Sequence, residues 1–498
     1  MTTSLSSTTG SISSAGIGSG LDVKSIITSL MAVESQPLTL LQQKASTVQT
    51  EISAVGQIQS LTSTLGDKAH ALSSSTLWTQ TTSSSADTTA VTADTSGGTA
   101  AAGDYSVSVQ QMAQGQTVTT AAAAGSTLNA GTITIQLGEY KSDTATPPNV
   151  TFQPASSAAV QIPIGASETS LSAIRDKINS MNAGVQASII TDANGSRLSL
   201  RSTATGAANG FQITTSETAD DGNPATGLSA LNFDASTAAT GSRMVLNQSA
   251  LNAKATVNGI DIESASNKLS NISDGLSLTL LRKTTSPVDV TVSADTASMQ
   301  KAITDFVSAY SAVQSYISLQ TKYDAGTAVA AGTSRQDGPL QGDPSIVGFQ
   351  NQLRAIVTTS SATSSMFSRL SDIGIAVQKD GTLSVASSTK LTSALAHPDE
   401  LSKLFTTYGT TNENTGIAVR FASLADKATS VDGALYSRNA GLKGELSRNQ
   451  KQQDDMQTHL DATQARLTAQ YQALDTTMSK MNALSSYVSQ QVALMQKA

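Results

Sequence analysis

The stretch that decides how this chain is organised runs from Leu446 to Met495 and reads LSRNQKQQDDMQTHLDATQARLTAQYQALDTTMSKMNALSSYVSQQVALM. Taken in steps of seven, it carries two stripes, which correspond to the d and a positions of a heptad repeat. The first stripe is interrupted only by Gln453, and the second is rich in glutamine at Gln450, Gln457 and Gln464. The candidate seam residues are Leu446, Leu460, Leu467, Tyr471, Leu474, Met478, Met481, Val488, Val492 and Met495.

A narrow heptad seam has to be covered by a partner helix, or it stays in water. An ordinary amphipathic helix packed on its own domain is the alternative for any single heptad. The repeat continues through the whole stretch without Pro or Gly, which favours the partner helix. The polar stripe predicts a coiled coil of conditional stability, ordered when its partner is present.

The composition excludes several classes of function. At 498 residues, we expect about three or four domains. A net charge of -7 argues against a nucleic-acid partner, because the phosphate backbone requires a surplus of Lys and Arg. The chain has no cysteine, and His70, His397 and His459 lie far apart, so the sequence predicts no disulfide, no metal site and no cofactor.

The N-terminus carries neither a basic segment nor a continuous apolar core, and no run of about 18 apolar residues occurs in the chain. We therefore expect no membrane insertion, and export without a cleaved signal peptide. The Ser/Thr-rich residues 1–14 should be disordered.

Helices are expected at the N-terminal end, over residues 23–33 and from Pro37 to Leu72. The Gly-rich residues 16–22 precede them. This segment could cradle phosphate, but no strand comes before it and its spacing is not that of a dinucleotide fingerprint, so that reading is disfavoured.

The middle of the chain alternates with the period of β-strands. Strands are expected near residues 91–93, 105–109, 132–137, 160–164, 185–191, 197–201, 211–214, 255–262, 276–280 and 288–292, with one helix at 170–181. Asn194-Gly195 and Asn258-Gly259 are hairpin signals.

Helical spacing returns at Met299. Its candidate seam is Met299, Ile303, Phe306, Tyr310, Val313 and Ile317. Helices follow at 346–357, 391–395 and 398–405, with a hairpin across Asp380-Gly381, and the final helical region begins near Ile417.

These residues resemble the flagellar filament cap family, flagellar hook-associated protein 2, over nearly the whole chain. The most specific part is the N-terminal motif Gly16, Ile17, Gly18, Gly20, Leu21 and Asp22, within residues 16–34. Supporting similarity lies at residues 103–109, 257–260, 305–310, 340–343 and 373–383, whereas Ser311 stands where most relatives have Asn. The resemblance is least informative at about residues 126–240.

The resemblance and the periodicities together predict an α+β multidomain fold with inserted β-rich head domains. We expect a terminal coiled-coil or disordered region at 1–37 and 411–498, and a helical-bundle leg domain with a hairpin at 38–78 and 293–410. A β-rich plate domain is expected at 79–125 and 241–292, and a β-rich outer head at 126–240.

The resemblance implies a homo-oligomeric cap of about five subunits at the distal tip of the filament, outside the cell. It would retain exported flagellin and promote its folding and insertion, contact the hook–filament junction protein, and meet an export chaperone at its C-terminal helix. Because Gln450, Gln457 and Gln464 would weaken the apolar seam, the cap could dissociate from the filament and bind it again.

Three other classes of protein are the alternatives. An adhesin would bind host mucin or glycans through the β head, whose Ser/Thr/Asn-rich loops suit sugars but also suit any extracellular surface. An enzyme is disfavoured because the sequence shows no nucleophile elbow and no histidine with an evident partner. Flagellin or another hook-associated protein is disfavoured by the motif at 16–22.

Overall fold

The computed structural model describes residues 22–95, 100–120, 128–193, 195–237, 242–323 and 337–496. The chain forms two compact units. The described parts of Met1–Ser75 and Ala297–Ala498 make a helical unit, and those of Thr76–Thr296 make a β unit. The α+β multidomain prediction is confirmed. Within the described segments, no helix combines the length and the apolarity needed to cross a bilayer.

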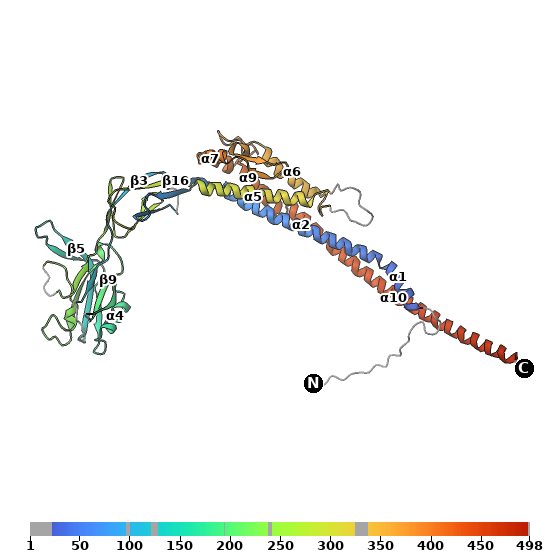
Figure 1. Ribbon diagram of the computed structural model, residues 1–498, viewed down its shortest axis with the longest axis horizontal. Coiled ribbons are helices and arrows are strands. Elements are labelled where there is room, and N and C mark those ends of the chain that lie inside the picture. The colour runs from blue at the N-terminus through green and yellow to red at the C-terminus, as the bar shows by residue number, and fades with distance from the viewer. Residues whose placement is uncertain are drawn as a thin grey trace. The chain divides into compact units, whose positions relative to one another are not determined.

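The helical unit contains most of the helices. They are α1 (Val23–Glu34), α2 (Gln36–Ser73), α5 (Thr296–Gln320), α6 (Pro344–Thr358), α7 (Ser388–Leu395), α8 (Pro398–Thr406), α9 (Ile417–Thr429) and α10 (Ala434–Met495). The unit also holds a short hairpin of β17 (Ile375–Val377) and β18 (Leu383–Val385). Helix α2 packs against both α9 and α10, and α1 continues along α10 (Figure 1).

The expected seam of α5 is buried along its whole length. Met299, Ile303, Phe306, Tyr310, Val313 and Ile317 are at most 1% exposed. The ring of Phe421, on α9, lies 5.1 Å from Phe306 and 5.6 Å from Tyr310, edge-on to both. Helix α9 therefore packs in the helical core next to α5, although the sequence-based division placed everything after residue 411 in the terminal region. Its apolar face is too broad for a coiled-coil stripe, and this distinguishes it from α10.

Local chemistry fixes the ends of the elements in this unit. The carboxylate of Asp343 caps α6 by accepting from the backbone N of Ser345 at 2.9 Å, and Pro344 occupies the first turn. The hairpin predicted across Asp380-Gly381 is present, with Gly381 at φ 84°. The hydroxyl of Ser311 donates to the carbonyl of Leu383 at 2.8 Å, so this residue of α5 holds the hairpin.

One part of the β unit consists of two antiparallel sheets that share a core of Val, Leu, Ala and Ile side chains. The five-stranded sheet has the order β1 (Thr81–Ser85), β16 (Val288–Ala294), β3 (Gly103–Gln111), β12 (Ala253–Val257) and β13 (Ile260–Ser264). The three-stranded sheet has the order β14 (Lys268–Ser273), β15 (Leu276–Leu280) and β2 (Val91–Asp94). Asn258 and Gly259, at φ 50° and 80°, form the predicted tight turn between β12 and β13.

The other part of the β unit has a separate core around Ile133, Ile135, Phe211 and Ile213. In its first sheet, β5 (Gly131–Ser142) pairs with β10 (Gly210–Glu217), β6 (Val150–Pro154) and β7 (Val160–Ile164). Its second sheet has the order β11 (Val245–Gln248), β4 (Thr117–Thr119), β9 (Gly195–Ser202) and β8 (Val185–Asp192), and α4 (Leu171–Ser180) packs on β8. Strands β8 and β9 pair as expected around residue 194, which is outside the described residues.

Candidate interaction surface on helix α10

The first half of α10 is paired within the chain. It runs antiparallel to α2, because residues further along α10 meet residues earlier in α2. Lys44 forms an ion pair with Glu445 at 3.0 Å, and the amide of Asn439 donates to the side chain of Gln59 at 3.0 Å. Leu435, Asn439, Leu442, Asn449, Leu460 and Thr463 are buried on this half. The ordinary alternative, a helix packed on its own domain, therefore describes residues 435–467.

The paired half of α10 does not use the seam register expected from the sequence. Gln450, Gln457 and Gln464 are exposed, so they do not dilute the covered seam. The covered stripe instead uses the residues one position earlier, where Asn449 and Thr463 are buried and Met456 is half-buried. Both registers share the column through Leu446, Leu460 and Leu467. The sequence alone could not distinguish them, because polar residues occupy positions on both sides of that column.

On the second half of α10, the described residues leave most of the apolar positions exposed. Leu474, Met481, Val488, Val492 and Met495 are 45 to 76% exposed, whereas Tyr471 and Met478 are half-buried. We call Leu474, Met478, Met481, Val488, Val492 and Met495 the distal stripe. Figure 1 shows α10 continuing beyond α1 as a single helix. Apolar side chains that recur at heptad spacing and are exposed to this extent are typical of a helix whose partner belongs to another chain.

The two halves of α10 use opposite sides of the shared column. In the paired half, the second column follows the first by three positions, as Asn449 follows Leu446. In the distal half it follows by four positions, as Tyr471 follows Leu467 and Met478 follows Leu474. A change of this kind shifts the apolar seam around the helix. The second column of the distal half therefore lies on the other side of the shared column from Asn449 and Thr463.

Of the N-terminal motif, only Asp22 lies within the described residues. Its carboxylate accepts from the backbone N of Ser25 at 3.0 Å and caps α1. Gly16, Ile17, Gly18, Gly20 and Leu21 are outside the described residues.

A charged cluster fastens α10 to the helical core. The guanidinium of Arg438 donates to the carboxylate of Asp343, the cap of α6, and also contacts Glu51 of α2 at 3.4 Å. The side chains of Asp343 and Glu51 are 3% and 19% exposed. Burial raises the pKa of Glu51, and the positive charge of Arg438 opposes that shift. No pattern in the sequence predicts this cluster, since its members are far apart along the chain.

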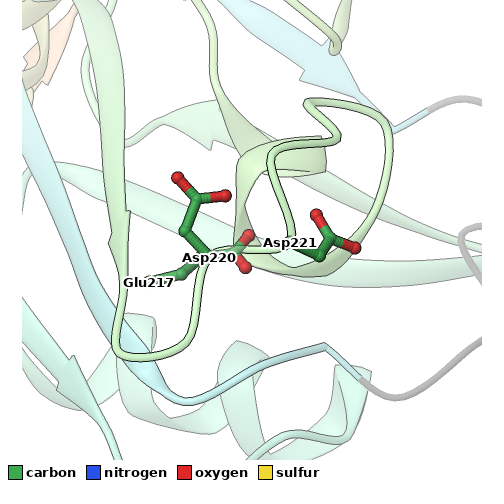
Figure 2. Close-up of side chains that lie close together, drawn as sticks. All are labelled: Glu217, Asp220 and Asp221. Carbon is green, nitrogen blue, oxygen red and sulfur yellow. The ribbon is translucent and has the colours of Figure 1, made fainter.

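A group of carboxylates in the β unit has a structural explanation. Glu217, Asp220 and Asp221 offer oxygens within 4.8 Å of one another, from the end of β10 and the loop after it (Figure 2). Burial opposes ionisation of Glu217, but hydrogen bonds from Asn129 and Ser229 outweigh it and lower its pKa. The hydroxyl of Thr226 lowers the pKa of Asp221 by donating to it at 2.6 Å. These bonds shape the loop, and exposed carboxylates alone do not define a metal site.

Comparison with known proteins shows which family the chain resembles. The N-terminal and C-terminal family models of flagellar hook-associated protein 2 match residues 19–116 and 250–483, and the flagellin hook IN motif matches residues 149–204. Flagellar hook-associated protein 2 of Escherichia coli K12 is 35% identical over 97% of this chain and 98% of its own length. The B-type flagellar hook-associated protein 2 of Pseudomonas aeruginosa is 30% identical over 94% of each chain.

A solved relative agrees with these matches. The crystal structure of the D1-D2-D3 domains of the flagellar cap protein FliD from Escherichia coli aligns with a TM-score of 0.57 at 31% identity. It covers 78% of this chain and 99% of the solved chain. A helical unit interrupted by β domains, with these similarities, defines a hook-associated protein of the bacterial flagellum. The chain belongs to the flagellar hook-associated protein 2 family.

Proposed function

We propose that this protein caps the growing flagellar filament. Copies of the chain assemble at the distal tip, retain exported flagellin, and promote its folding and insertion beneath the cap. Family membership and the cap function named for the Escherichia coli structure support the class of function. The observation that carries the proposal is the distal stripe, an apolar seam that the described part of this chain leaves uncovered.

The proposed mechanism is mechanical. The paired half of α10 stays attached to α2 through the Arg438 cluster, and the distal half extends as a leg with its own apolar seam. The leg binds helices of the filament or of the hook–filament junction protein. The seam is interrupted by Ser485. A contact of this limited apolar area can dissociate and re-form as each flagellin subunit arrives.

The experiment that tests the function is complementation of a strain that lacks its own filament cap. Cells that produce the full chain should form long filaments, and cells without it should release monomeric flagellin into the medium. Release of monomeric flagellin despite normal export of the chain would contradict the proposal.

The role of the distal stripe is tested with a matched pair of variants. Val488→Ser with Val492→Ser removes two stripe residues, whereas Ala493→Ser with Leu494→Ser removes apolar side chains from outside the stripe on the same helix. Only the first variant should lose filament formation, because only it weakens the seam. Equal filament lengths for both variants would exclude the stripe as the filament contact.

We also propose that an export chaperone covers the distal stripe before secretion, since an exposed apolar seam promotes premature association. Full-length protein should co-purify with this chaperone from cells, and the stripe variant should recover much less of it than the control variant.

A further inference from the structure

The first helices of the helical unit carry a second exposed apolar stripe. Leu30, Val33 and Leu40 are 40, 63 and 64% exposed. Ser35, between α1 and α2, keeps a helical backbone at φ -80° and ψ -9°, so the helical period continues from α1 into α2. At these spacings the three side chains share one face, and the half-buried Ile26 extends it by one turn. We call Ile26, Leu30, Val33 and Leu40 the outer stripe.

A different side of α1 packs within the chain. Val23 is buried, Ile27 and Met31 are half-buried, and α1 lies along α10 (Figure 1). A helix that is apolar on two sides is typical of one packed between two other helices. Helix α10 accounts for one of these sides, and the described residues leave most of the outer stripe exposed.

The distal stripe of the same chain cannot cover the outer stripe. The side-chain amide of Gln453, on α10, lies 3.5 Å from the carbonyl of Leu41. Because the two helices run antiparallel, equal steps along both place Val23, the start of α1, near Tyr471. From there α10 continues as a single helix to Met495 and runs on past α1 (Figure 1). A return of the distal stripe to α1 would break this helix, so the two stripes can meet only between two copies of the chain.

The two stripes match in spacing, length and charge. Each contains apolar residues seven positions apart, which is the repeat of a two-helix seam. At the rise of an α-helix, the distal stripe is about 32 Å long and the outer stripe about 21 Å, so the first can cover the second. Neither residues 25–33 nor residues 481–495 include Asp, Glu, Lys or Arg. The net charge of -7 therefore places no like charges inside this contact.

We propose that the distal stripe of one copy packs on the outer stripe of a second copy. This inference rests on the self-association proposed above and names the two surfaces that meet. Because the contact joins different surfaces of the two chains, it is head-to-tail and can continue around a closed ring. The distal stripe holds one helix at a time, so a leg leaves the neighbouring copy when it binds the filament.

Cysteine cross-linking between two full-length variants tests the contact directly, because the natural chain has no cysteine. One protein carries Val33→Cys, and the other carries one cysteine at a successive heptad of the distal stripe: Leu474→Cys, Met481→Cys, Val488→Cys or Met495→Cys. After mixing and mild oxidation, at least one of the four pairs should give a disulfide-linked heterodimer. Thr28→Cys, exposed on another side of α1, should replace Val33→Cys with a yield about tenfold lower.

A double-mutant cycle shows whether the two stripes contact each other. Leu30→Ser with Val33→Ser should raise the apparent dissociation constant for self-association about tenfold or more, as measured by sedimentation velocity. Adding Val488→Ser with Val492→Ser should raise it little further, because both pairs of substitutions remove the same contact. Effects that simply add would show that the stripes bind different partners, and would overturn the inference.

A matched control separates this contact from a general loss of apolar surface. Leu319→Ser with Val431→Ser removes two exposed apolar side chains of the helical unit that belong to neither stripe. The dissociation constant of this control should stay within about twofold of the wild-type value, and an effect as large as that of the outer-stripe variant would count against the proposal.

The outcomes separate this inference from the proposal on which it rests. Wild-type protein that stays monomeric at all concentrations overturns both. Assembly without a cross-linked heterodimer in any of the four pairs overturns only the contact between the stripes. Failure to cap filaments despite such a heterodimer overturns only the proposed function. If the outer-stripe variant assembles normally but binds flagellin less tightly, the outer stripe binds a flagellin helix and the second-copy proposal is wrong.

Discussion

At the scale of single residues, Glu400 gives the helical unit a defined dependence on pH. Lys403, the hydroxyl of Ser364 and the backbone N of Ser365 donate to its carboxylate and lower its pKa to about 2. Because the pKa is lowered in the folded state, the contribution to stability is full above the ordinary value of 4.5 and is lost as the pH falls towards 2.

Urea unfolding midpoints of the wild-type protein and of Glu400→Gln, measured at several pH values, test this dependence. Wild-type protein should exceed Glu400→Gln in stability at pH 6, and the difference should shrink between pH 4.5 and the lowest pH at which the protein remains folded. A difference that stays constant across this range would show that the ionised carboxylate is not the stabilising form.

Arg438 provides a second prediction at the residue scale. Replacing it with Met leaves Asp343 and Glu51 as two poorly exposed carboxylates without their shared cation. The free energy of unfolding of the helical unit should fall by about 2 kcal/mol. Lys443→Met, at an exposed position on the same helix, should change it by less than about 0.5 kcal/mol. Urea unfolding followed by circular dichroism at the helical wavelength checks both, and equal effects would contradict the role given to the cluster.

At the level of elements, the structure and the heptad repeat disagree on which residue of α10 faces α2: the structure places Asn449 there, and the heptad repeat predicts Gln450. Asn449 is 2% exposed, and its amide nitrogen lacks a partner among the described residues. Asn449→Leu should therefore stabilise the pairing of α10 with α2 by about 1 kcal/mol. Gln450→Leu, one position along on the exposed side, should have little effect. If only Gln450→Leu stabilised the pairing, Gln450 would lie in the covered seam, as the heptad repeat predicts, and the register seen in the structure would be wrong.

The elements also show what could be predicted from sequence. The seam of α5 has apolar residues at every position, so its burial followed directly from its period. Strand β1 reads TTSSS and was missed, because without apolar alternation only its pairing with β16 makes it a strand. The register of α10 and the pairing of Arg438 were beyond prediction for a related reason, since both depend on contacts between residues hundreds of positions apart.

At the scale of the whole molecule, the β unit should fold alone. The chain enters it through β1 and leaves it through β16, and these strands pair directly, with Thr81 opposite Ala294. A fragment of residues 76–296 should unfold cooperatively on heating. A fragment that begins at residue 100 lacks β1 and β2 and should be markedly less stable. A fragment 76–296 without a cooperative transition would show that the β unit depends on the helical unit.

Helix α10 has one half paired within the chain, and we propose that its other half binds other chains. Amide hydrogen exchange along α10, in dilute protein and in the assembled state, tests it most directly. We predict slow exchange at residues 435–467 in both states, and fast exchange at residues 481–495 that slows on assembly. Equal protection of the two halves in the dilute monomer, or no gain over residues 481–495 on assembly, would contradict the account.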